Sequence, residues 1–435
     1  MPAPALRILL VQPASFFLPG TDLVEDEVFA GLVRTYYKLR SAGTPGREFA
    51  VGLALPLLAA LVPAPVAEIR IVNAAREAIP YDDAFDIVGI TLATAQAVEA
   101  WRIAAEFRAR GVHVAVGGSH VSLVPDEAVA HADTIFVGEA DDTWPLFINE
   151  FRAGRARPRY DGGRNTNLAK LPAPRVDLLA PIDRQQVFVQ WSRGCPRGCS
   201  YCSVPKLAGA TLRTKPVRQM VEEVRELRDA TGSRSFFFAD DNMLLDPALA
   251  APLLDGLAAL GISWATQTEV SVAREPDLLR RMRDSGCVSV LLGLEDVVPD
   301  GLASLSRFKR GLIDRYAEDV INIQAHGVQV CGAFIFGTDA HDEGVFEGVR
   351  AFSLETGMAR LQASVLTPLP GTRVRRRLEA EGRLLDKPWS NYNFFGVNFV
   401  PRRIGAAELR RGTVTALLEH PGRWERRDVV AVEHV

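Results

Sequence analysis

Three of the chain's five cysteines lie within one short segment, at Cys195, Cys199 and Cys202, with the spacing C-x3-C-x2-C. Glycine and proline residues between them keep the segment out of regular structure, so it is predicted to be a loop. The preceding residues, 185–190, have the apolar character of a short strand. Thiolates are ligands for soft metal ions, so this loop is a candidate metal centre at the end of a strand.

The number of thiolates limits which metal centre the loop can hold. A structural zinc site needs four protein ligands, but Cys287 and Cys331 are far away in sequence and no histidine lies near the loop. A 4Fe-4S cluster held by three cysteines leaves one iron open to another ligand. By ligand count alone a cluster fits the three thiolates better than zinc, and a redox dithiol at Cys199 and Cys202 stays open.

The same loop carries a family resemblance. C-x3-C-x2-C with an aromatic residue, Tyr201, before the last cysteine resembles the radical S-adenosylmethionine (radical SAM) superfamily. The resemblance implies that Cys195, Cys199 and Cys202 hold a 4Fe-4S cluster, and that its open iron chelates the amino and carboxylate groups of SAM. It also implies that Tyr201 lies near the adenine and that a donor such as flavodoxin or ferredoxin supplies the electron.

The elements after the loop alternate in type. Strands are predicted over 185–190, 235–239, 262–266, 288–292, 328–336 and 361–366, with helices between them, one of these over 311–326. Six such units predict a partial (β/α)6 TIM barrel, which keeps its chemistry at the carboxyl ends of the strands. By the radical SAM resemblance, the expected SAM contacts besides Tyr201 are Asp240, Asp241, Gln267, Glu295 and Thr367. Many relatives have a serine after that glutamate, whereas this chain has Asp296.

The first third of the chain has its own strand–helix rhythm. Strands over 5–11, 68–73, 87–91, 112–117 and 134–138 predict a doubly wound, Rossmann-like parallel sheet, which binds ligands at the strands' carboxyl ends. Glycines at those ends allow close backbone approach to a large planar ligand. The pattern resembles the cobalamin-binding domain that precedes many radical SAM domains. That resemblance implies cobalamin contacts at Thr91, Thr94, Gly117, Gly118, Ser119, His120, Gly138, Glu139 and Ala140.

A cobalamin-type histidine motif lies in the wrong half of the chain. Asp339-Ala-His341-Asp-Glu-Gly344 fits the Asp-x-His-x-x-Gly pattern that supplies a lower axial histidine to cobalt in many cobalamin proteins. It follows the glycine pair at 117–118 instead of preceding it. We interpret it as a chance match and expect cobalamin to bind without a protein histidine ligand.

The domain organisation follows from these patterns. Residues 1–151 are predicted to form the cobalamin-binding domain, 152–184 a linker, 185–372 the radical SAM barrel, and 373–435 a C-terminal extension. The extension carries an aromatic cluster in which Trp389 and Tyr392 either contact substrate or pack the extension on the barrel. Cys287 and Cys331 lie in apolar strands and are expected to be buried.

Composition narrows the class of protein. With 435 residues, 48% hydrophobic and 24% charged, the chain fits a globular protein of two or three domains. A net charge of −3 gives no sign of the basic surface that binds nucleic acid. Five cysteines without a disulfide-pairing pattern are typical of a protein of the reducing cytoplasm. Residues 49–67 carry no charge but include three prolines, so we expect a buried helix on the first domain and no membrane span.

The combined resemblance covers residues 5–400. It implies a cobalamin-dependent (class B) radical SAM enzyme, similar to the methyltransferases that act on unactivated carbon. Such an enzyme would use a 5′-deoxyadenosyl radical and methylcobalamin to methylate a small, natural-product-like molecule of secondary metabolism. Two alternatives share these motifs: a cobalamin-dependent cyclase or rearrangement enzyme without methyl transfer, and a non-catalytic cobalamin- or cluster-binding protein.

Overall fold

A computed structural model describes residues 5–14, 21–40, 51–63 and 65–420. The first domain is a six-stranded parallel sheet with the order β2-β1-β3-β4-β5-β6. Its strands are β1 (Leu6–Gln12), β2 (Ala67–Asn73), β3 (Ile87–Thr91), β4 (His113–Gly117), β5 (Thr134–Gly138) and β6 (Arg159–Gly163). The doubly wound, Rossmann-like sheet predicted from the sequence is confirmed, but β6 lies inside the segment expected to be a linker.

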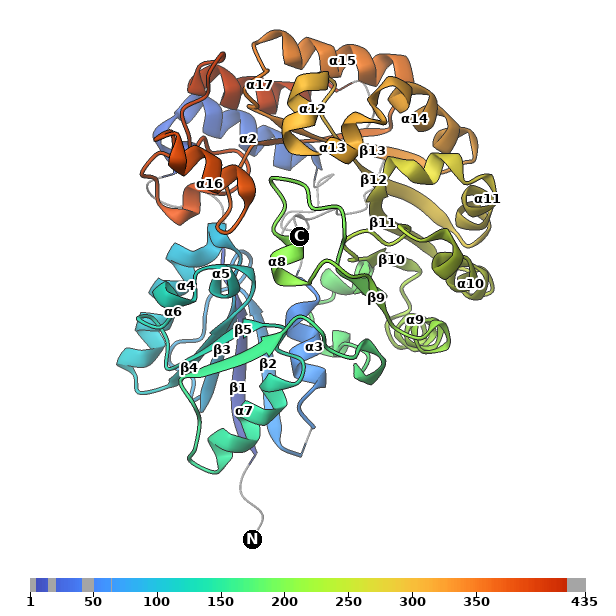
Figure 1. The fold of residues 1–435 in the computed structure, drawn as a ribbon. Coiled ribbons are helices and arrows are strands. Elements are labelled where there is room, and N and C mark those ends of the chain that lie inside the picture. Colours follow the sequence, from blue (N-terminus) through green and yellow to red (C-terminus); the bar gives the residue numbers. More distant parts are fainter. Residues whose placement is uncertain (1–4, 15–20, 41–50, 64, 421–435) are drawn as a thin grey trace.

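Helices cover both faces of this sheet, as its continuous apolar strands require. They are α3 (Ala54–Ala60), α4 (Ala97–Ala109), α5 (Ser119–Leu123), α6 (Pro125–Ala128) and α7 (Thr143–Arg152) (Figure 1). In β1, Ile8 and Leu10 face one apolar core while Leu9 and Val11 face the other. The uncharged run at 49–67 contributes α3, whose residues 55–57 are buried on the sheet, as predicted. Among the described residues, no helix is long and apolar enough to cross a membrane.

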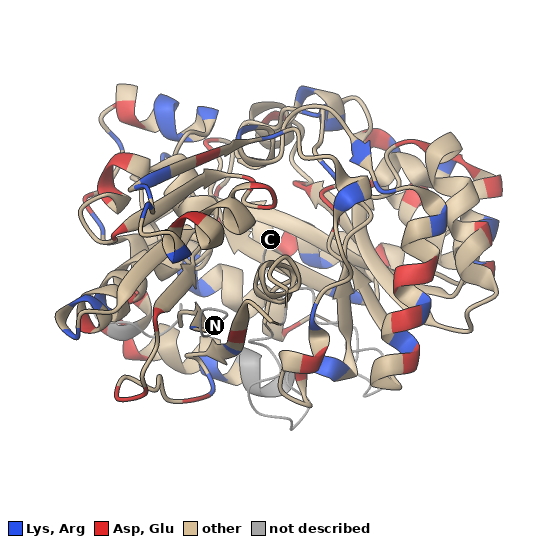
Figure 2. Ribbon diagram, turned by 90° about the horizontal axis from the view of Figure 1, so that it is seen from below, with Lys and Arg blue, Asp and Glu red and all other residues tan. Residues whose placement is uncertain are grey.

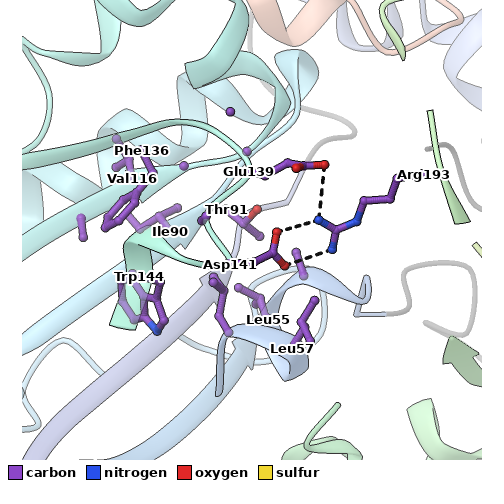
Figure 3. A pocket seen from close by; sticks show the side chains of 18 residues that line it. Leu55, Leu57, Ile90, Thr91, Val116, Phe136, Glu139, Asp141, Trp144 and Arg193 are labelled. Carbon is purple, nitrogen blue, oxygen red and sulfur yellow. Dashed lines mark hydrogen bonds and ion pairs between the residues drawn. The ribbon is translucent and has the colours of Figure 1, made fainter. Parts of the chain in front are cut away.

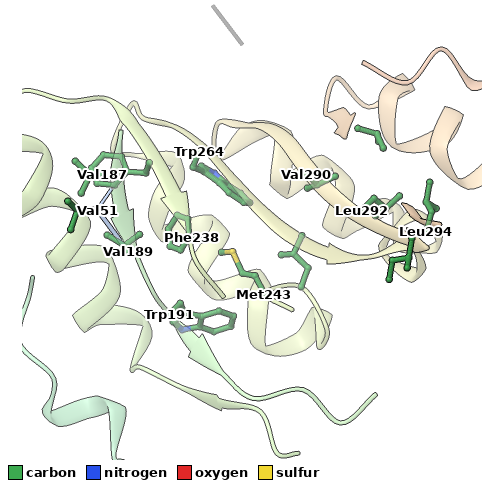
Figure 4. Packing of buried hydrophobic residues seen from close by; sticks show 14 of the residues in the cluster. Val51, Val187, Val189, Trp191, Phe238, Met243, Trp264, Val290, Leu292 and Leu294 are labelled. Atoms are coloured by element: carbon green, nitrogen blue, oxygen red, sulfur yellow. The ribbon is translucent and has the colours of Figure 1, made fainter. Parts of the chain in front are cut away.

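The second domain is an open, six-stranded parallel sheet whose strands follow chain order, apart from a small hairpin inserted after the first of them. The strands are β7 (Val187–Val189), β10 (Ser235–Phe238), β11 (Ser263–Glu269), β12 (Cys287–Glu295), β13 (Gln329–Phe336) and β14 (Arg360–Val365). Their outer face is covered by α9 (Val217–Thr231), α10 (Pro247–Ala258), α11 (Pro276–Asp284), α14 (Tyr316–Ala325) and α15 (Gly344–Thr356). Phe238, Trp264 and Val290 pack in the apolar layer on that face (Figure 4). This is the partial barrel predicted from the sequence.

Several short elements around the cysteine loop were not predicted. Residues 299–310 form α12 (Pro299–Leu305) and α13 (Arg307–Arg310), and the helix expected over 311–326 begins only at Tyr316. A two-stranded antiparallel hairpin, β8 (Ser192–Arg193) with β9 (Arg213–Thr214), flanks the cysteine loop, which leads into α8 (Val204–Leu207). These elements matter because they surround the three cysteines.

The two helices after β1 lie against the C-terminal extension. The sequence placed them in the first domain, but they do not pack on its sheet. After α1 (Asp22–Glu25), α2 (Glu27–Arg40) packs on α17 (Ala406–Leu418), above α16 (Arg373–Ala380) in Figure 1. Buried Asp22 accepts hydrogen bonds from the Val397 N–H at 2.9 Å and from Lys387 Nζ at 3.1 Å. These contacts hold the two domains together in addition to the chain segment that links β6 to β7.

Charge is dispersed over the molecule. In the view of Figure 2, basic and acidic residues are interspersed along the helices, and neither sign forms an extended area. This agrees with the net charge of −3.

Candidate active site

The cysteine loop leaves the hairpin strand β8 through a glycine that no other residue could replace. Gly194 has φ +93°, and a Cβ there would overlap the carbonyl oxygen of Thr211. The loop then carries Cys195, Cys199 and Cys202 as free, partly exposed thiols. Its shape is therefore fixed at the residue immediately before the first cysteine.

The three thiols lie close enough to influence one another. Burial, together with smaller contributions from the charges of Cys199 and Cys195, raises the pKa of Cys202 to about 12. Burial also raises the pKa of Cys195, with a contribution from Cys199. A metal centre would have to displace these protons, as bound metal ions do.

The donor set fits a cluster better than a single ion. Among the residues that the structure describes, no three His, Cys, Asp or Glu side chains converge closely enough to hold one metal ion. In an iron–sulfur cluster each thiolate binds its own iron, so the donors need not converge on one point. Cys287 and Cys331 are buried among apolar residues and lie in strands β12 and β13, as expected.

Carboxylates from the end of β10 hold the beginning of the loop. Asp240 is fully buried and accepts hydrogen bonds from the N–H groups of Trp191 (3.1 Å) and Ser192 and from Ser192 Oγ (2.5 Å). Asp241 accepts one from the Gly194 N–H at 2.7 Å. Burial raises the pKa of Asp240 to about 7, although the hydrogen bonds from Ser192 and Trp191 act in the opposite direction. These two predicted SAM contacts thus have a role in positioning the loop.

A second carboxylate, at the end of β11, holds the middle of the loop. Arg197 lies between the first two cysteines and donates to both oxygens of Glu269, at 2.7 and 2.6 Å. The Arg197 guanidinium carbon also lies 3.8 Å from the ring centroid of Phe308. Burial alone would raise the pKa of Glu269, but the hydrogen bonds from Arg197 and Ser271 lower it, so the pair is ionised.

A third carboxylate, at the end of β12, holds the last part of the loop. The Tyr201 hydroxyl donates to Glu295 Oε1 at 2.6 Å, and the buried Lys309 Nζ donates to the same oxygen at 2.5 Å. Glu295 has φ +70°, a strained conformation for a residue with a side chain and one that often marks a functional site. Lys309, on α13, was missed from sequence because that helix was not foreseen.

The remaining predicted SAM contacts also have partners within the barrel. Gln267 Nε2 donates to the carbonyl oxygen of Asp240 at 2.8 Å, and Thr367 Oγ1 donates to that of Val365 at 2.9 Å. All six residues lie at or just beyond the carboxyl ends of strands or in the cysteine loop. Their direct contact with SAM stays a prediction.

The histidine of the Asp-x-His-x-x-Gly match belongs to the barrel. His341 is buried, and its Nδ1 accepts a hydrogen bond from the Gly337 N–H at 3.0 Å. The proton is therefore on Nε2, which donates to Asp296 Oδ2 at 2.6 Å. Both ring nitrogens are occupied inside the second domain, which accounts for the motif without cobalamin.

A cavity of about 180 Å³, open to solvent on one side, lies at the carboxyl end of the first sheet (Figure 3). Its wall is mainly apolar and includes Leu55 and Leu57 from α3, Ile90, Phe136 and Trp144. Six predicted cobalamin contacts line it, namely Thr91, Gly117, Gly118, Gly138, Glu139 and Ala140. An apolar recess with a few polar groups fits one face of a large organic cofactor.

The other three predicted contacts, Thr94, Ser119 and His120, are not among the residues lining this cavity. His120 is buried, with Nδ1 3.4 Å from Thr94 Oγ1 and its ring 5.1 Å from that of Trp389. Burial lowers the pKa of His120. His120 and Thr94 therefore pack toward the C-terminal extension.

The glycines of the first domain are required by its own backbone. Gly118 has φ +107°, and a Cβ there would lie 2.6 Å from the carbonyl oxygen of Leu92. Gly138 has φ +82°, and a Cβ there would overlap the carbonyl oxygen of Gly163 in β6. These glycines were expected to allow the approach of a ligand, but their immediate cause is the close approach of adjacent chain segments.

Ion pairs join the cavity to the cysteine loop. Arg193, two residues before Cys195, lines the cavity and donates to both oxygens of Asp141 at 2.6 and 3.0 Å (Figure 3). Arg213 of β9 donates to Glu139 at 2.5 and 3.0 Å. Arg193, Arg213 and Asp141 were missed from sequence, although the position of Arg193 beside the loop was a usable signal.

The aromatic residues of the C-terminal extension pack between the domains. Trp389 Nε1 donates to Glu127 Oε2 of the first domain at 2.8 Å. Tyr392 is buried, its ring lies 5.0 Å from that of Trp389, and its hydroxyl accepts a hydrogen bond from Arg375. These contacts favour the packing interpretation, and substrate contact by Trp389 or Tyr392 stays a prediction.

Comparison with known proteins identifies the second domain. Residues 189–350 match the family model of the radical SAM superfamily. These residues therefore form a radical SAM domain. It is 29% identical over 342 residues to bacteriochlorophyllide d C-12(1)-methyltransferase of Chlorobaculum tepidum, covering 77% of this chain and 74% of that one. It is 27% identical to the C-8(2)-methyltransferase of the same organism, over 78% of this chain and 79% of the relative. Both relatives are methyltransferases, and each match covers about three quarters of both chains.

The whole two-domain fold has a solved counterpart. The radical SAM methyltransferase TsrM from Kitasatospora setae, solved with cobalamin and a 4Fe-4S cluster bound, matches with a TM-score of 0.61 and 14% identity. The match covers 87% of this chain and 78% of TsrM. At this identity it establishes the shared fold of both domains.

Proposed function

We propose that this enzyme methylates a carbon atom of a small molecule, with a 4Fe-4S cluster at Cys195, Cys199 and Cys202 and cobalamin in the first-domain cavity. The observation that carries the proposal is the shared wall: Arg193 lines the cavity and stands two residues before the first cysteine. When bound, these groups supply one-electron reduction of SAM and a methyl-carrying cobalt centre. The role of the protein is to hold the two cofactors in fixed positions relative to each other.

The residues around the cavity define how cobalamin would be held. The apolar wall formed by Leu55, Leu57, Phe136 and Trp144 suits an uncharged ring system, and Thr91 offers a hydroxyl. Among the described residues, no histidine lines the cavity, since His120 packs behind it. This supports binding without a histidine ligand to cobalt.

The barrel residues keep the cysteine loop fixed while chemistry occurs. Asp240 and Asp241, Glu269 and Glu295 hold its beginning, middle and end, each from a strand end. Fixed groups in a partly buried site hold reactants at short range and limit the access of water. Tyr201 is held by Glu295, which supports its expected place beside the SAM adenine.

The substrate is proposed to be a largely apolar small molecule. Two relatives that cover most of this chain are named for bacteriochlorophyllide d, and a third relative is a hopanoid methylase. Inside the barrel, Phe237, Leu291 and Cys331 form an apolar layer with Phe188. Such a layer favours an apolar group over a charged one.

Methyl-deuterated SAM tests the reaction without knowledge of the substrate. Reduced protein loaded with cobalamin is expected to form deuteromethyl-labelled cobalamin, detected by mass spectrometry. Bacteriochlorophyllide d is the first substrate to test, and a labelled methyl group on product carbon is the expected result. Unlabelled product with stoichiometric 5′-deoxyadenosine would instead indicate a cyclase or rearrangement enzyme.

A further inference from the structure

The inner face of the barrel sheet can be identified from its register. Successive residues of a strand point to opposite faces, and residues paired across a parallel ladder point to the same face. Phe237, Leu291 and Cys331 form an apolar cluster separate from the core beneath the helices, so they mark the inner face. Cys331 of β13 is paired with Arg360 of β14. The buried Arg360 side chain therefore belongs to the inner wall of the barrel.

The last strand of the sheet, β14, contributes polar side chains to this wall. Its residues Leu361 and Ala363 pack in the core beneath the helices. The residues that alternate with them, Arg360 and Gln362, accordingly face inward. Gln362 is also in register with Ala333, which packs against the inner cluster. Two polar side chains, one of them charged, thus lie beside an apolar part of the inner wall.

The position of Arg360 relative to the cysteine loop also follows from the register. The pairing across the sheet runs from Arg360 through Cys331 and Leu291 to Gln267. Glu269, two residues beyond Gln267, is the carboxylate that holds the middle of the cysteine loop. A strand rises about 3.3 Å per residue, so Arg360 lies about 7 Å deeper in the barrel than the row that contains Glu269. A molecule bound at Arg360 would extend from the inner wall toward the strand ends, where barrel enzymes keep their chemistry.

The chemistry of these two polar side chains suits a carboxylate. A guanidinium stays charged at physiological pH, and its planar fork donates two parallel hydrogen bonds to the oxygens of a carboxylate. Gln362 is half-buried, and within the part of the chain that the structure describes its amide makes no hydrogen bond. Its NH2 group is therefore available as a further donor beside Arg360. The apolar cluster next to them suits the uncharged remainder of such a molecule.

We propose that the barrel takes a substrate in which an apolar body carries a carboxylate, and that Arg360 and Gln362 bind this carboxylate. The inference deepens the proposed function and rests on it for the reaction that follows binding. A molecule anchored at one end presents a fixed part of its body to the strand ends, so Arg360 determines which carbon can react. A wall built to pair with a charged group also rejects an analogue that lacks this group. Arg360 is therefore assigned as a specificity-determining residue.

The test compares two fluorescent probes, pyrenebutyric acid and its methyl ester, which share an apolar ring system and differ in one negative charge. Fluorescence anisotropy with the holoenzyme should give a Kd for the acid at least about tenfold lower than that for the ester. Arg360→Gln should abolish this preference, whereas Arg360→Lys, which keeps the charge, should retain part of it. Gln362→Leu should weaken binding of the acid about threefold and leave that of the ester unchanged. Arg280→Gln, at an exposed position on α11, is the matched control and should change neither Kd.

Each outcome decides the proposal. Equal affinity of the parent for acid and ester, or no binding of either, would overturn it, and so would a preference that persists in Arg360→Gln. If Arg360→Gln does not fold into an iron-loaded protein, an unchanged preference in Gln362→Leu would overturn it instead. If the preference depends on Arg360 but the parent forms no deuteromethyl-labelled cobalamin from methyl-deuterated SAM, the substrate site stands and the proposed function fails.

Discussion

The strand ends of the two domains differ in composition. In the first domain they carry mainly glycines and apolar side chains around a cavity of about 180 Å³, and carboxylates only after β5, at Glu139 and Asp141. In the barrel they carry carboxylates, and four of these, Asp240, Asp241, Glu269 and Glu295, bind residues of the cysteine loop or the hairpin residues just before it. Both sheets are parallel and place their carboxyl ends beside the same loop.

This difference reflects two tasks. A cavity with an apolar wall can receive one face of a large organic cofactor with little need for charge. A metal-binding loop has no regular structure of its own, so charge-assisted hydrogen bonds from a rigid sheet must hold it. Substitutions at one site should therefore impair the cofactor proposed there without affecting the cofactor proposed at the other site.

The largest effect is expected for Cys199→Ala. Loss of a cluster ligand should lower reductive SAM cleavage by at least about a thousandfold, while cobalamin binding is retained. Iron content and 5′-deoxyadenosine release measure the first property, and equilibrium dialysis measures the second. Cys331→Ala, in the apolar layer of the barrel, is the control. A Cys199→Ala protein that cleaves SAM as well as the parent would contradict the cluster assignment.

A large side chain in the cavity should have the converse effect. Ala140→Phe places a ring in the space proposed for cobalamin and should weaken cobalamin binding by about ten- to a hundredfold. Iron content and SAM cleavage should stay unchanged. Ala153→Phe, at an exposed position after α7, is the matched control. Normal cobalamin affinity in Ala140→Phe would place the cofactor elsewhere.

Arg197→Lys separates charge from geometry in the loop. Lysine keeps the positive charge but cannot donate to both oxygens of Glu269, so the middle of the loop should be held less firmly. We expect iron to be lost to a chelator about tenfold faster, with cobalamin binding unaffected. Arg225→Lys, in an exposed pair with Glu222 on α9, should change nothing. If Arg197→Lys and the parent lost iron at the same rate, the pairing with Glu269 would not stabilise the loop.

The smallest effect is expected where the domains meet. Trp389→Phe removes the hydrogen bond to Glu127 and should lower the free energy of unfolding by about 1 kcal/mol, with kcat and KM unchanged. Denaturant titration and steady-state kinetics measure the two properties. Trp101→Phe, which removes the other indole bond to Glu127, is the comparison. A raised KM with unchanged stability would make Trp389 a substrate contact.

The regular elements were largely predictable from sequence. Apolar strands punctuated by glycine and proline gave both sheets to within a few residues, because buried parallel strands need continuous apolar runs. The polar edge strand β6 and the short helices α12 and α13 were missed, because they have neither a long apolar run nor a repeated helical period. The seating of α2 on α17 depends on Asp22, whose partners lie more than 360 residues away in the chain.

The sequence by itself determined which side chains can bind a metal centre. Three thiols at C-x3-C-x2-C, the glycines that bend the chain and the order of strands and helices all follow from local composition. The tertiary structure alone decided which carboxylate holds which part of the loop, and that six of nine expected residues line the cavity while His120 packs behind it. The physical reason is distance along the chain: Gly194 meets Asp241 across 47 residues, Arg197 meets Glu269 across 72, and Tyr201 meets Glu295 across 94. Such pairings arise only when parallel strands bring their ends to one edge.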